Sequence, residues 1–114
     1  MSKLLITIIL FCLGNILIWF QTNGQFLWRW FDKHPVFLSI VFGGVISYFF
    51  IYATKIGYNY FDGLLWPVKF VGFSVGILTY AGLTYYFMSE SLSLKTIICL
   101  VLAFLIIGIQ VLWK

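Results

Sequence analysis

Charged side chains are scarce in this sequence. Only 9% of its 114 residues are Asp, Glu, Lys or Arg, whereas 63% are hydrophobic. Soluble domains carry roughly 25% charged residues, because a hydrated surface keeps them in solution. A chain with so little charge lacks that surface. The composition therefore predicts a protein that resides in a lipid bilayer, with residues 1–114 forming one membrane domain.

Side chains that perform chemistry are also few. The single histidine, His34, lies between Lys33 and Pro35 in a connecting segment, so neither a metal cluster nor a Ser-His-Asp triad can be assembled around it. Cys12 and Cys99 fall within apolar runs, where thiols behave as small hydrophobic side chains. We therefore expect no catalytic residues, no metal, no cofactor and no enzymatic activity.

The seven basic residues give the chain a formal net charge of +4, but they are scattered singly along it. A nucleic-acid-binding surface needs basic residues that cluster into a patch. We therefore expect no nucleic-acid partner. The simpler explanation of these charges is that they orient the chain in the membrane.

Four long apolar runs account for most of the chain, at about residues 4–20, 36–54, 64–88 and 96–113. Each is near the roughly 20 residues that a helix needs to cross a bilayer, and none alternates as the strands of a membrane barrel do. Because apolar character returns three times after the first run, that run is expected to be retained rather than cleaved. The predicted fold class is an all-α, integral membrane four-helix bundle.

The connections between the runs have distinct compositions. Residues 21–35 interleave aromatic with charged side chains, which predicts a short amphipathic piece along the membrane interface. Residues 55–63 are also expected at the interface, with Asp62 as a helix cap. The serines and the glutamate of residues 89–93 suit the start of a helix, and this short turn predicts an antiparallel hairpin of the last two spans.

Four spans place both termini on the same side of the membrane. That side holds four basic residues if Lys69 is included, against three on the other side, so the positive-inside rule favours cytoplasmic termini. We expect a bacterial-type inner membrane. A bias this small also permits insertion in both orientations. The four are Lys3, Lys55, Lys69 and Lys114, and the three are Arg29, Lys33 and Lys95.

Small residues mark candidate surfaces of close helix packing. Gly72 and Gly76 form such a pair in the third run, and Gly43 and Gly44 give the second run a comparable patch. Glycine allows helix backbones to approach closely in lipid. Two interpretations remain open at this stage, packing within the chain on one hand and a dimer contact or substrate groove on the other.

Polar residues within the apolar runs are the candidate substrate-binding residues. Asn15 lies deep in the first run, where its amide needs a partner, either another helix or a substrate. Tyr48 and Tyr80 are the tyrosines whose mid-span positions would place a hydroxyl in a cavity. Lys69 shares the helical stripe of Gly72, so it either faces an anion or water inside the protein or extends to the lipid headgroups.

Short pieces of the chain resemble the drug/metabolite transporter superfamily. The stretch from Met88 to Cys99, followed by Leu105 to Gly108, resembles the last hairpin of that superfamily, and the layout looks like that of the small multidrug resistance exporters. The chain is also similar to a family of small uncharacterised four-span proteins, which share the motifs Asn15-Ile16 and Ile56-Gly57-Tyr58.

The resemblance implies a transporter that acts as a dimer. The small exporters use a carboxylate in the first span to exchange protons for a cationic substrate, whereas this sequence has Asn15 in that region and no acidic residue in any span. Asn cannot exchange a proton, and Lys69 would repel a cation. We therefore expect a protein that moves or binds a small or lipid-linked substrate, as a homodimer or with a second small membrane subunit. The alternative is a non-transporting accessory subunit of a larger membrane complex.

Overall fold

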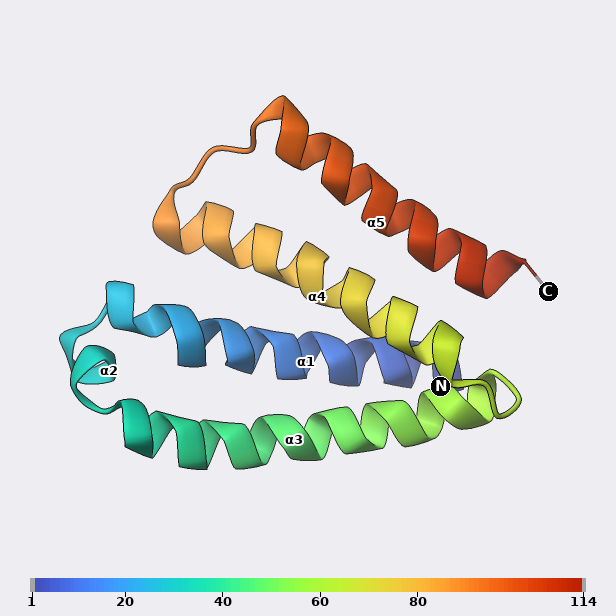
Figure 1. The fold of residues 1–114 in the computed structure, drawn as a ribbon, viewed down its shortest axis with the longest axis horizontal. Coiled ribbons are helices and arrows are strands. Elements are labelled where there is room, and N and C mark those ends of the chain that lie inside the picture. The colour runs from blue at the N-terminus through green and yellow to red at the C-terminus, as the bar shows by residue number, and fades with distance from the viewer. Residues whose placement is uncertain (1, 114) are drawn as a thin grey trace.

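The computed structural model describes residues 2–113 and is built from helices throughout that range. The four long helices are α1 (Lys3–Asn23), α3 (Pro35–Tyr60), α4 (Leu65–Met88) and α5 (Leu94–Leu112), shown in Figure 1. Each is long and apolar enough to cross a membrane. The predicted helical class and the positions of the four runs are therefore confirmed, although α3 continues past the predicted end at residue 54 to Tyr60.

Local sequence explains where several helices begin. The hydroxyl of Ser2 accepts a hydrogen bond from the backbone N–H of Leu5 at 3.2 Å, and the hydroxyl of Ser93 accepts one from that of Thr96 at 3.3 Å. These are ordinary N-caps, which satisfy backbone donors at a helix start. Pro35 begins α3, where its missing N–H is tolerated. The expected serine cap of the last helix is confirmed at Ser93.

The turn between α3 and α4 does not use Asp62 as a cap. Asp62 and Gly63 have φ angles of 57° and 81°, so two successive left-handed residues reverse the chain. The residue that flanks α4 is Leu64, which makes no side-chain capping bond. The predicted cap is wrong because these left-handed residues place Asp62 outside the first turn of α4.

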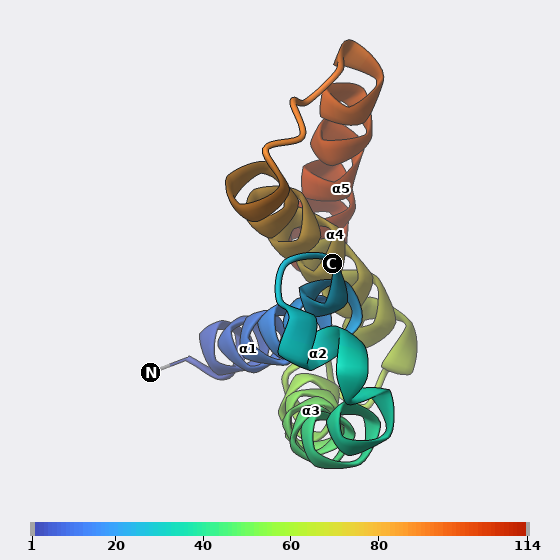
Figure 2. The same ribbon diagram turned by 90° about the vertical axis from the view of Figure 1, so that its left-hand side faces the viewer.

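A short helical segment joins α1 to α3. It consists of a 3-10 turn, η1 (Gly24–Phe26), and the five-residue helix α2 (Arg29–Lys33). Figure 2 shows α2 across the ends of α1 and α3. The rings of Trp28 and Phe31 lie 5.3 Å apart at their centroids, so this segment is held by aromatic contacts. The segment expected to be a short amphipathic piece is helical, and its position at a membrane interface stays a prediction.

The long helices form an open arrangement. Helix α1 packs extensively against both α3 and α4, which diverge from their connecting turn with α1 between them (Figure 1). Helix α5 has extensive contacts only with α4 and lies outermost (Figure 2). Among the described residues of α5, Ala103 alone is buried. The structure is therefore a group of three helices with α5 attached to α4, which is more open than the four-helix bundle expected from the sequence.

The core is small and lies where α1, α3 and α4 meet. Its buried cluster consists of Phe11, Ala53, Val68, Val71 and Val75. Most other large apolar side chains are exposed around the outside of the helices. Helices that are apolar on all sides need apolar surroundings, because water would contact that whole surface.

Candidate functional site

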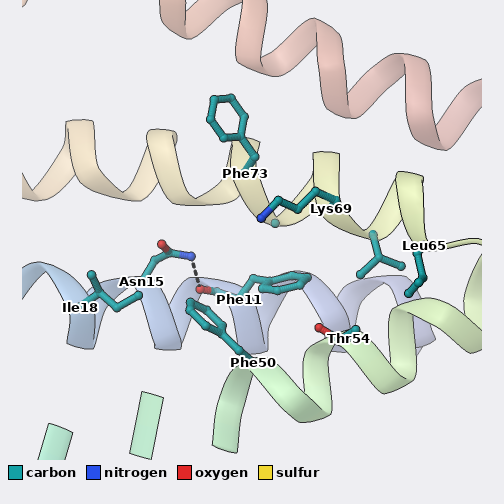
Figure 3. A pocket seen from close by; sticks show the side chains of 10 residues that line it. Phe11, Asn15, Ile18, Phe50, Thr54, Leu65, Lys69 and Phe73 are labelled. Atoms are coloured by element: carbon teal, nitrogen blue, oxygen red, sulfur yellow. Dashed lines mark hydrogen bonds between the residues drawn. The ribbon is translucent and has the colours of Figure 1, made fainter. Parts of the chain in front are cut away.

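A cavity of about 480 Å³ lies between α1, α3 and α4, and we call it the central groove (Figure 3). It exists because α3 and α4 contact each other little beyond their connecting turn, so α1 forms its floor. Two of the predicted substrate-binding residues, Asn15 and Lys69, line this groove although 53 residues separate them in the chain. The complete lining is Phe11, Asn15, Ile18, Phe50, Thr54, Leu65, Val68, Lys69, Gly72 and Phe73.

Asn15 makes its hydrogen bond within α1. Its Nδ2 donates to the carbonyl oxygen of Phe11 at 2.7 Å (Figure 3). In the described chain this bond replaces the interhelical bond that one interpretation of the sequence expected. The Oδ1 of Asn15 faces α4, where a Cβ built on Gly76 would be 2.9 Å from it. One of the two N–H donors of the amide is therefore occupied, and its acceptor oxygen lies at the contact between α1 and α4.

Lys69 is the only charged residue that lines the described groove. Its side chain runs along α4 away from Leu65, toward the middle of the helix rather than its start (Figure 3). The three acidic residues of the chain are Asp32, Asp62 and Glu90, and all lie outside the four long helices. The groove therefore has a positive charge without a carboxylate in its lining.

Aromatic side chains form much of the groove wall. Phe11 and Phe50 face each other with ring centroids 5.8 Å apart. Phe73 borders the groove from α4, but its ring points away from α1 and α3 and is exposed (Figure 3). Thr54 adds a hydroxyl from α3 (Figure 3). Sequence reasoning did not single out any of these four residues. Because α3 and α4 are apolar all round, no contrast of polarity indicated which face of each helix lines the groove.

The predicted glycine pairs behave differently. A Cβ on Gly72 would be 3.1 Å from Phe11 and one on Gly76 would be 2.9 Å from Asn15, so both glycines allow α4 to approach α1. A Cβ on Gly43 would have only the Gln21 amide nearby, at 3.7 Å, and a Cβ on Gly44 would meet no atom within 4 Å apart from its own stretch of helix. The packing expected of Gly44 is thus not made within this chain, because that side of α3 faces outward.

The two candidate tyrosines lie outside the central groove. Tyr48 is 60% exposed, with its ring 4.9 Å from that of Tyr52 on the same helix. Tyr80 is 54% exposed and lines a separate hollow of about 300 Å³ between α4 and α5, together with Glu90. The structure therefore does not bring either tyrosine together with Asn15 and Lys69.

No family model matches this chain, and no curated protein or solved structure matches it significantly. The resemblance to the drug/metabolite transporter superfamily thus rests on the short motifs and the four-helix layout alone. Any functional conclusion has to come from the groove and its residues.

Proposed function

We propose that this is an integral membrane protein of the transporter type, which binds a small or lipid-linked substrate in the central groove and moves it across the bilayer. The observation that carries the proposal is the meeting of Lys69 and Asn15 in one groove between long apolar helices. Polar and charged side chains are costly within a bilayer, so those that remain commonly line the path of a substrate or an ion.

The distribution of apolar surface supports insertion into a membrane. Four helices have the length and composition of membrane spans, and large hydrophobic side chains are exposed along all of them. Helix α5 is the extreme case, since Ala103 is its one buried residue among those described. In lipid this surface needs no protein cover, whereas in water it would cause aggregation.

The open groove favours an oligomer as the working unit. Three helices border the groove and leave it open on one side, so a neighbour is needed to enclose a substrate. The outward side of α3 at Gly44 offers a surface for close approach. The neighbour in this proposal is a second copy of the chain or a second small membrane subunit. The same open surfaces would serve an accessory subunit of a larger complex, which is the alternative function.

Filling the groove is expected to abolish substrate binding. Thr54→Trp places a large ring in the groove from α3, whereas Val101→Trp puts the same ring on α5, at a site that is 52% exposed and outside the groove lining. Purified protein in lipid vesicles is titrated with a fluorescent amphiphile, and flux is then measured. We expect saturable binding and flux for wild type and Val101→Trp, and a loss of at least about tenfold in affinity for Thr54→Trp. Absence of saturable binding or flux in wild type would contradict the proposal and favour the accessory subunit.

Both termini are expected on one side of the membrane, with the cytoplasmic side in the majority. Four crossings require a common side, and the count of basic residues favours the cytoplasm. Reporter fusions at each end of the chain measure this directly. Reporters in opposite compartments would rule out four spans, whereas a mixed signal from each terminus would indicate insertion in both orientations.

A further inference from the structure

We infer that the central groove takes an anionic amphiphile, that is, a molecule with a phosphate or carboxylate headgroup and an alkyl chain. This inference rests on the proposed substrate-binding role of the groove and specifies the class of substrate. It depends on three features of the lining, namely its charge, its apolar wall and the placement of the ammonium group.

The positive charge of the groove favours a ligand with a negative charge. Lys69 is the one charged side chain of the described lining, and all acidic residues of the chain lie outside the long helices. Lys69 is exposed within the open groove. In the bilayer of the proposed function its surroundings have a low dielectric constant, and interactions between charges are several-fold stronger there than in water. An ammonium without a carboxylate beside it therefore attracts a phosphate or carboxylate and repels an organic cation.

The apolar wall of the groove favours a ligand with an alkyl chain. The rings of Phe11 and Phe50 line it together with aliphatic side chains, and its volume of about 480 Å³ is typical of small-molecule sites. The groove is open to the exposed apolar surface of the helices, so the rest of a chain can continue along that surface. A small hydrophilic anion would leave the aromatic wall without a partner.

The placement of Lys69 puts the headgroup inside the groove. The side chain runs along α4 away from Leu65 and toward the middle of the helix (Figure 3). Gly72, which also lines the groove, is three residues further along α4 and packs on Phe11. An anion on the ammonium group therefore lies beside the aromatic wall. Thr54 lines the same groove from α3 and adds a hydroxyl to its lining.

The test compares three competitors on purified protein in phosphatidylcholine vesicles, using a fluorescent amphiphile as the reporter. The competitors are dodecyl phosphate, dodecyltrimethylammonium and inorganic phosphate. We expect dodecyl phosphate to bind at least about tenfold more tightly than the cation of equal chain length, and inorganic phosphate not to compete in the same range. If inorganic phosphate competed as well as dodecyl phosphate, the inference of an amphiphilic ligand would be overturned, and the ligand would be a soluble anion.

Variants assign the selectivity to Lys69. Lys69→Gln should reduce the preference for dodecyl phosphate to near unity, whereas Lys69→Arg should keep it, because the charge is retained. Lys95→Gln is the matched control, since Lys95 begins α5 and lies outside the groove lining. An unchanged preference in Lys69→Gln would show that Lys69 extends to the headgroups of the bilayer and would overturn the inference. If Lys69→Gln does not fold, the wild-type selectivity and Lys69→Arg still decide the question.

The inference and the proposed function fail in different ways. Saturable binding without a preference for the anionic amphiphile would overturn the inference that the substrate is anionic. The proposal that the groove binds a substrate would still stand. Absence of saturable binding for every amphiphile would overturn both.

Discussion

Replacing Gly76 by Leu is expected to separate α4 from α1 and to leave little correctly folded protein. A Cβ at this position would already be 2.9 Å from Oδ1 of Asn15, and leucine adds three more carbons. Asn15 cannot easily turn away, because its Nδ2 is bonded to the Phe11 carbonyl oxygen at 2.7 Å. Overpacking of this kind costs about 1–3 kcal/mol or more, which is a large part of a typical folding free energy.

The matched control for this substitution is Gly44→Leu. A Cβ on Gly44 would meet no atom within 4 Å apart from its own stretch of helix, so leucine fits there and removes a helix-destabilising glycine from α3. Thermal unfolding and size-exclusion profiles of the detergent-solubilised proteins measure both effects. Equal stability of Gly76→Leu and wild type would contradict the packing of α4 on α1. A normal fold with a smaller oligomer in Gly44→Leu would place the subunit contact at this face.

Trp19→Ala is expected to be the second strongly destabilising substitution. Trp19 is 1% exposed, and its Nε1 donates to the Thr84 hydroxyl at 2.9 Å, which joins α1 to α4. Its ring also lies 5.5 Å from that of Phe87. Loss of this packing and of the bond costs about 3 kcal/mol, at the low end for a buried tryptophan, because lipid contributes no hydrophobic driving force between helices.

Two variants separate the causes of that loss. Trp19→Phe keeps an aromatic ring but removes the donor, so it should cost about 1 kcal/mol. Trp66→Ala removes the same side chain from a site that is 74% exposed and should change the unfolding temperature little. Similar losses for Trp19→Ala and Trp66→Ala would show that the contact between Trp19 and Thr84 does not hold α1 and α4 together.

The positions of the long helices were predictable because each coincides with a continuous apolar run. The end of α3 was not predictable from this rule, since Lys55 suggested a connection at that point. The helix continues because Gly57 is buried, and a Cβ there would be 3.1 Å from Thr7 and 3.2 Å from Val68. This contact involves α1, α3 and α4, so it cannot be predicted from a local pattern in the sequence.

The candidate site was predictable only in its polar part. Asn15 and Lys69 stand out because they are polar residues in apolar runs, and the structure brings both to one groove. Tyr48 and Tyr80 were chosen for their depth, yet they face outward, because a tyrosine is compatible with core, lipid and interface alike. Phe50 and Thr54 are four residues apart on one face of α3, but no contrast of polarity distinguishes that face.

Photocrosslinking from the groove tests the central claim most directly. Benzoylphenylalanine replaces Phe50, which lines the groove, or Tyr48, which is exposed on the same helix. The protein is placed in phosphatidylcholine vesicles that contain a small share of dodecyl phosphate, and the crosslinked molecules are identified by mass spectrometry. Our account predicts products enriched in dodecyl phosphate at position 50, an enrichment that Lys69→Gln removes, and products that mirror the bulk lipid at position 48. The same bulk composition at both positions would contradict a substrate site in the central groove.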